Sequence, residues 1–68
     1  MEKLILKVPT IKCEGGVQNI QRVLTQRKGI AQVEGNPDTK DVMVAYLREE
    51  IGDEEIREAI LQMGHQIG

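Results

Sequence analysis

Apolar and polar positions alternate in three segments of the chain, and this period of two is typical of β-strands. The first segment is residues 3–8, KLILKV, and the others are residues 30–35 and 41–47. The sequence NPDTK lies between the last two segments, and its proline, asparagine and aspartate favour a turn. The pattern therefore predicts one strand near the start of the chain and a β-hairpin in its middle.

Two other segments have the period of an amphipathic helix. The first runs from Gly16 to Lys28, and Gly29 behind it is a natural left-handed stop. The second is predicted to begin at Gly52 or Asp53 and to end at Gly64. The side chains predicted to face the core are Val17, Ile20, Val23 and Leu24 in the first helix and Ile56, Ala59, Ile60 and Met63 in the second.

The order of these elements predicts the fold class. Residues 65–68, HQIG, are expected to form a short closing strand, so the order is strand, helix, strand, strand, helix, strand. This order predicts an α+β, ferredoxin-like βαββαβ fold, with a four-stranded antiparallel sheet and two helices on one face. A chain of 68 residues has room for one small core, so residues 1–68 are expected to form a single domain.

Composition narrows the classes of partner. The formal net charge is −2 with both signs interspersed, and Tyr46 is the only aromatic residue. A nucleic-acid binder needs a basic face and usually aromatic side chains that stack on bases, so we expect no nucleic-acid partner. No apolar run approaches the roughly 18 residues of a membrane span, and we expect no membrane insertion. A lone reduced thiol fits a cytoplasmic protein.

The only cysteine, Cys13, precedes the first predicted helix within the sequence IKCEGGVQNI. The predicted fold brings this loop and the loop after the second helix to the same end of the sheet, so Cys13 and His65 are expected to be neighbours. A thiolate and an imidazole both suit Cu(I), and a helix N-terminus favours an anionic ligand. A second interpretation stays open, in which Cys13 is a small buried side chain and His65 an ordinary surface residue. Met43 is expected in the core.

The sequences VPTIKCEGG and EEIREAILQMGHQI give the chain a resemblance to a known family. From about Leu4 to Ile67 it resembles the heavy-metal-associated domain of copper chaperones and copper-transporting P-type ATPases, and most of all the small cyanobacterial copper metallochaperones. In that family a Met-x-Cys-x-x-Cys loop binds Cu(I) between two thiolates. Here Cys13 matches the first cysteine, whereas Ile11 replaces the methionine and Gly16 replaces the second cysteine.

The resemblance implies a cytosolic, copper chaperone-like protein whose partner is the metal-binding domain of a copper-transporting ATPase. His65 matches a histidine that the cyanobacterial relatives use as an auxiliary ligand, so Cys13 and His65 are the expected metal ligands. Because one thiolate cannot form the two-sulfur site, three completions are open. His65 could supply the second donor, two chains could form a homodimer through their Cys13 loops, or a partner's cysteines could capture the metal.

The sequence leaves other functions open. The chain could be a degenerate domain that binds no metal and serves as a protein-interaction module. The sequence GGVQNIQR resembles the anion-binding loop of acylphosphatases, but Arg22 is one position out of step and Asn19 stands where a glycine is required. A nucleotide-binding or amino-acid-sensing regulator of the same topology is a further alternative, for which the sequence around Gly29 is uninformative. A shared fold does not carry chemistry, and we expect the protein not to be an enzyme.

Overall fold

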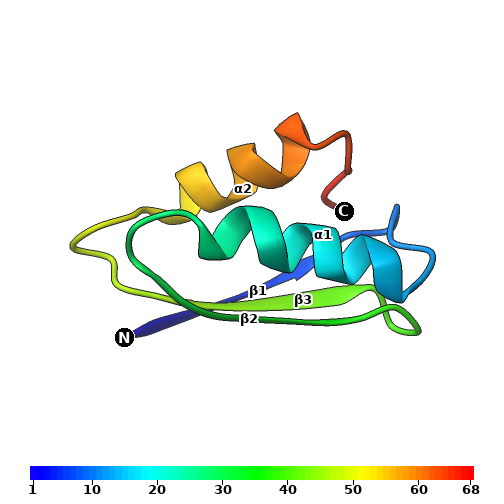
Figure 1. Ribbon diagram of the computed structural model, residues 1–68, viewed down its shortest axis with the longest axis horizontal. Helices are drawn as coiled ribbons and strands as arrows, with labels where there is room; N and C mark the ends of the chain where they lie inside the picture. The colour runs from blue at the N-terminus through cyan, green and yellow to red at the C-terminus, as the bar shows by residue number, and fades with distance from the viewer.

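The computed structural model describes all residues from 1 to 68 and contains three strands and two helices. The strands are β1 (Glu2–Lys7), β2 (Ile30–Asn36) and β3 (Asp41–Tyr46), and the helices are α1 (Glu14–Thr25) and α2 (Asp53–Gln62). The sheet is antiparallel in the order β1-β3-β2, so β3 is central. Both helices lie on the same face of this sheet (Figure 1), as the ferredoxin-like fold requires.

The predicted fourth strand is absent, and this part of the prediction was wrong. Residues 65–68 make one backbone hydrogen bond to the outer edge of β1, from the N–H of Gly68 to the carbonyl of Lys7 at 2.9 Å. A strand needs a ladder of such bonds, and one is too few to form it. Residues 65–68, which follow α2 in the sequence, therefore lie against the end of β1 without extending the sheet.

The boundaries of the first helix also differ from the prediction. Helix α1 begins at Glu14, two residues before Gly16, because Cys13 already has the extended backbone of an N-cap residue, with φ −157° and ψ 173°. The helix ends at Thr25, because a tighter turn follows in which the N–H of Arg27 bonds the carbonyl of Leu24 at 3.0 Å. Gly29 then has a φ of +95°, the left-handed conformation predicted for it.

The core lies between the helices and the sheet and is built from aliphatic side chains. Its largest fully buried members are Ile11, Ile20, Leu24, Ile56, Ile60, Val8, Val42 and Val44. The inward faces predicted for both helices are largely confirmed, although Val23 is half-buried and Met63 packs against the core from its margin. The expectation for Met43 was wrong, because its position in β3 places it on the face of the sheet that no helix covers.

The close approach of α1 to β2 depends on one glycine. A Cβ atom at Gly35 in β2 would lie 2.8 Å from Cγ1 of Val17 in α1, a distance that no real side chain tolerates. Glycine at this position lets the start of α1 pack directly on the edge strand. The position of the α1 N-terminus, and of Cys13 in front of it, is fixed by this contact.

None of the helices is both long and apolar enough to cross a membrane.

Candidate metal centre

Two buried side chains anchor the loop between β1 and α1 to the core. Val8 and Ile11 are both 0% exposed, and the N–H of Ile11 donates to the carbonyl of Val8 at 3.1 Å, which closes a tight turn. The next residues, Lys12, Cys13 and Glu14, are all exposed. Burial of Ile11 therefore pins the loop to the core, while the thiol two residues later faces solvent.

Cys13 has the geometry of an available ligand. It is the N-cap residue of α1, yet its side chain makes no capping hydrogen bond. Its Sγ atom would lie 3.6 Å from a Cβ atom at Gly15, so any side chain at that position would rest against the sulfur. The glycine leaves this side of the sulfur uncovered. The alternative of a buried structural cysteine is contradicted, because the side chain is exposed.

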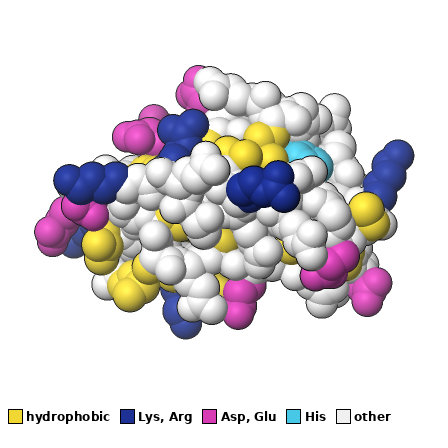
Figure 2. Space-filling view, in the orientation of Figure 1, with side chains coloured by type: hydrophobic (Ala, Val, Ile, Leu, Met, Phe, Trp, Pro, Cys, Tyr) yellow, Lys and Arg dark blue, Asp and Glu magenta, His cyan; other side chains and the backbone are white.

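His65 is held at the same loop by a specific hydrogen bond. Its Nδ1 atom lies 2.8 Å from Oγ1 of Thr10, a residue separated from it by 55 positions in the sequence. The same Oγ1 accepts the N–H of Gln66 at 3.1 Å, so Thr10 holds two successive residues behind α2. The imidazole is half-buried, and its cyan atoms reach the surface in Figure 2. The expected approach of the two loops is thus present, although no hydrogen bond joins His65 to Cys13 directly.

The Thr10 contact also decides what the imidazole can do. Thr10 Oγ1 has two lone pairs, so it can accept both the Gln66 N–H and a proton on Nδ1 of His65. In that arrangement Nε2 carries a lone pair and can bind a metal. If the hydroxyl donates to Nδ1 instead, Nε2 carries the proton and is no ligand. Metal binding through Nε2 therefore selects the tautomer in which Nδ1 donates to Thr10, an arrangement common for metal-binding histidines.

Lys40, at the end of the β2–β3 turn, makes two hydrogen bonds to the loop between β1 and α1. Its ammonium donates to the carbonyl of Ile11, and its own backbone carbonyl accepts the N–H of Val8 at 2.7 Å. Lys40 has a φ of +64°, which is uncommon for a residue with a side chain, and this conformation closes the β2–β3 connection. The hairpin thus holds both ends of the segment from Val8 to Ile11, just before Cys13.

Neither Thr10 nor Lys40 was identified as a site residue from the sequence. Thr10 is a threonine in a loop, and only the position of His65 in space shows what its hydroxyl binds. Lys40 closes the NPDTK turn, but a lysine carries no sequence signal for a positive φ or for a contact with a residue 29 positions earlier. The spacing of chemical groups along the chain could not have revealed either contact.

The ligand set available within one chain is small. The chain has no group of three or more His, Cys, Asp or Glu side chains placed to share a metal ion. A Cβ atom at Gly16 would lie 3.8 Å from Cγ2 of Ile11, an ordinary contact distance, so the backbone there has room for a side chain. Cys13 and His65 are the only thiol and the only imidazole on the chain, so one chain offers no second thiolate.

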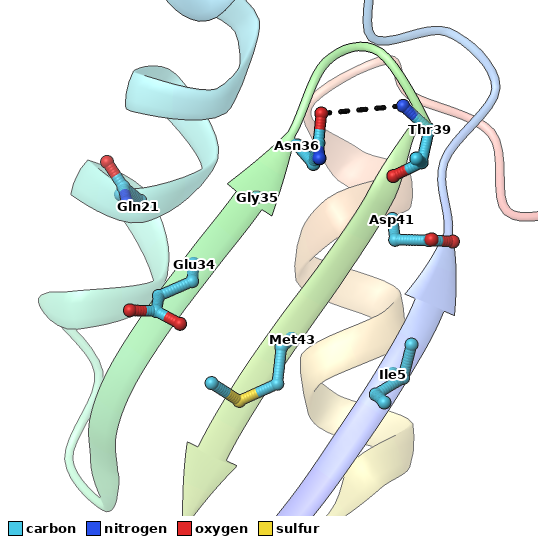
Figure 3. Close-up of a pocket in the computed structure, with 8 residues that line it drawn as sticks. All are labelled: Ile5, Gln21, Glu34, Gly35, Asn36, Thr39, Asp41 and Met43. Carbon is cyan, nitrogen blue, oxygen red and sulfur yellow. Dashed lines mark hydrogen bonds between the residues drawn. The ribbon is translucent and has the colours of Figure 1, made fainter.

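The largest hollow of the molecule lies elsewhere. It is on the open face of the sheet, where Ile5, Met43 and Glu34 form a row across the three strands (Figure 3), and neither Cys13 nor His65 lines it. At the hairpin end of this face the ammonium of Lys7 lies 3.2 Å from Asp41. Hydrogen bonds from Lys7 and Thr39 hold the pKa of the Asp41 carboxyl below its usual range. This hollow is exposed and has no bearing on the thiol.

Comparisons with known proteins agree with this fold. The model of the heavy-metal-associated domain matches residues 5–66. Among solved structures, the CopZ metallochaperone has a TM-score of 0.94 at 19% identity, covering 98% of this chain and 100% of that chain. The soluble region of the P-type ATPase CopA from Bacillus subtilis has a TM-score of 0.92 at 24% identity, over 97% of this chain and 44% of that chain.

A structure of Atx1, described as a copper trafficking site, has a TM-score of 0.82 at 28% identity, over 96% of this chain and 98% of that chain. No curated protein sequence matches the chain significantly. The family model covers nearly all of the chain, including the Cys13 loop and His65. The chain belongs to the heavy-metal-associated domain family.

Proposed function

We propose that residues 1–68 act as one cytoplasmic metal-binding domain that holds Cu(I) through Cys13, with His65 as the second donor, in the manner of a copper chaperone. The observation that carries the proposal is the hydrogen bond between Thr10 and His65, which ties the only imidazole to the loop of an exposed thiol. A thiolate and an imidazole suit Cu(I) better than harder cations. Copper is the cargo of this site, and its binding releases the thiol proton.

The geometry favours completion by His65 over the other two arrangements. Pairing of two chains through Cys13 would leave the Thr10–His65 contact without a role in metal binding. Capture by a partner's cysteines remains the natural step of transfer, since a metal held by one thiolate and one imidazole can be taken by two thiolates. Structural neighbours include the soluble region of the ATPase CopA, so we propose a metal-binding domain of such an ATPase as the recipient.

Competition for Cu(I) against a chromophoric chelator tests the proposal. Wild-type protein should bind one Cu(I) per chain, Cys13→Ser should lose binding, and His65→Ala should weaken it. Acidification should also weaken binding by the wild type, because protonation removes the ligand lone pair of the imidazole. Affinity of the wild type no better than that of Cys13→Ser would end the proposal and leave an interaction module without metal. A ratio of one Cu(I) per two chains would instead identify the thiol-bridged dimer.

The role of Thr10 gives a more specific prediction. Thr10→Val keeps the shape of the side chain but removes the oxygen that orients His65, so Cu(I) affinity should fall about tenfold or more, as for other groups that orient metal ligands. The matched control is Thr25→Val, because the Thr25 hydroxyl bonds carbonyls within α1 and lies in another part of the molecule. Equal affinities for the two valine variants would show that the Thr10 hydroxyl does not orient a metal ligand.

A further inference from the structure

The open face of the sheet, which no helix covers, has an apolar centre. The register sets Ile5, Met43 and Glu34 in one row across the three strands, and Ala45 is the next residue of β3 on this face. Ile5 and Met43 lie on adjacent strands in Figure 3, and Ile5 is 70% exposed. An antiparallel sheet commonly turns a polar face to water, and the apolar pair at the centre of this face departs from that pattern.

The charged side chains of the same face are not all paired. Lys7 and Asp41 lie 3.2 Å apart at the hairpin end, so their charges cancel. Lys3, on β1, makes no ion pair, and Glu34, on β2, accepts only a hydrogen bond from Gln32 at 3.0 Å. One unpaired cation therefore lies on one outer strand and one unpaired anion on the other outer strand, with the apolar side chains between them.

This arrangement is complementary to itself. Lys3 is two strands and one row away from Glu34, a separation of about 12 Å at ordinary strand spacings. A two-fold axis in the plane of the face, midway between these two residues and perpendicular to the line joining them, places Lys3 of each copy opposite Glu34 of the other. Met43 and Ala45 lie beside this axis, and Ile5 of one copy then falls near Met43 of the other. The strands of the two copies cross at a steep angle, as in orthogonal sheet packing.

We infer that the open face of the sheet is a contact surface between two copies of this chain, which associate face to face about that axis. Ile5 and Met43 supply the apolar centre, and the two pairs of unlike charge fix the orientation. Three rows about 6.8 Å apart on three strands about 4.8 Å apart cover roughly 15 by 20 Å, which is small for a permanent dimer, so the association is weak and reversible. Neither Cys13 nor His65 lines the hollow on this face, so the contact is independent of metal binding.

The test is the association of the metal-free protein with a reducing agent present, which excludes a disulfide through Cys13. Sedimentation velocity should show a monomer–dimer equilibrium, and the NMR amide signals of Ile5, Met43 and Ala45 should shift as the protein concentration rises. Ile5→Thr should keep the fold, because this side chain is exposed in the monomer, and should weaken association about tenfold or more. A monomer at every concentration, or shifts confined to other surfaces, would overturn the proposal.

An exchange of charges tests the orientation of the two copies. Lys3→Glu and Glu34→Lys should each weaken self-association about tenfold, because like charges then meet at both contacts of the dimer. An equimolar mixture of the two variants should associate again, because each supplies the charge that the other lacks. Lys12→Glu and Glu14→Lys make the same changes of net charge on either side of Cys13, where both side chains are exposed, and should associate like the wild type. Equal weakening in these controls, or no recovery in the mixture, would overturn the proposal.

Discussion

The two strand-to-helix loops, β1–α1 and β3–α2, have the same backbone arrangement and differ in the residues at the helix N-terminus. In the first loop Ile11 is buried, and the extended N-cap residue is Cys13. In the second loop Ile51 is 3% exposed, and the extended N-cap residue is Gly52, with φ −100° and ψ 161°. Neither helix has a side-chain cap. Each loop is thus an anchored turn that delivers a helix N-terminus at a fixed place.

The difference lies in charge. Asp53, Glu54 and Glu55 occupy the first turn of α2, so the positive end of its dipole is neutralised by carboxylates of its own. The first turn of α1 carries only Glu14, followed by two glycines, and a thiol stands at its N-cap. The second loop therefore presents only hard carboxylate oxygens at its helix N-terminus, whereas the first presents an accessible soft sulfur. Anchoring alone does not make a metal site, because the two loops share it.

The largest effects are expected from removing the buried side chains that anchor the two loops, Ile11 and Ile51. Ile11→Ala and Ile51→Ala should each cost about 2–5 kcal/mol of unfolding free energy, because each deletes a buried side chain and leaves a cavity. Urea unfolding of both variants measures this cost. When affinity is compared for the folded fraction of each variant, only Ile11→Ala should have an altered Cu(I) affinity. An equal loss of affinity in Ile51→Ala would mean that global stability, and not the position of the loop, governs the site.

Gly16→Cys enlarges the difference between the two loops by adding a second thiol to the first. The new Cβ atom would lie 3.8 Å from Ile11, so the fold should tolerate it. A second thiolate on the same turn should raise Cu(I) affinity about a hundredfold or more, because the second bond is intramolecular. Gly16→Ser, which has the same shape without the sulfur, is the control. Competition with a chelator measures both variants, and an unchanged affinity in Gly16→Cys would show that the sulfurs do not converge.

The lysines beside the two loops give a smaller contrast. Lys40→Met should lower the free energy of unfolding by about 1.5 kcal/mol, because the half-buried ammonium of Lys40 bonds the carbonyl of Ile11. It should also lower Cu(I) affinity, because Ile11 lies two residues before Cys13 in the same loop. Lys28 contacts Glu50 in the second loop at 3.5 Å with its side chain 85% exposed. Lys28→Met should therefore change the free energy of unfolding by less than about 0.5 kcal/mol. Urea unfolding and chelator competition measure the two effects, and equal costs would contradict a clamp by Lys40.

The smallest expected effect is the response of stability to acid. The pKa of Asp41 is lowered in the folded protein, first by its hydrogen bond with Lys7 and then by that with Thr39. A lowered folded pKa contributes stability above the ordinary carboxyl pKa of about 3.9, and this contribution is lost as the pH falls through the folded value. Urea midpoints from pH 6 down to pH 2 should decline less in Asp41→Asn than in the wild type. Parallel profiles would remove Asp41 as a cause.

The sequence determined the elements and their inward faces, because burial imposes a period of two on strands and of 3.6 on helices. Residues 3–8, the hairpin and both helices were found with small errors at their ends. Cys13 was identified because a lone thiol before a helix is chemically conspicuous, and His65 because the predicted topology places its loop nearby. The closing strand was predicted from its order in the chain, but its formation depended on backbone bonds that the pattern does not encode.

Only the tertiary structure decided how those residues are held. The bonds from Thr10 to His65 and from Lys40 to Ile11 join positions 55 and 29 residues apart, and neither leaves a periodic trace. Hydrophobic periodicity reports which side of an element is buried. It does not report which polar groups meet across the fold, because each such contact depends on the distance between two particular atoms.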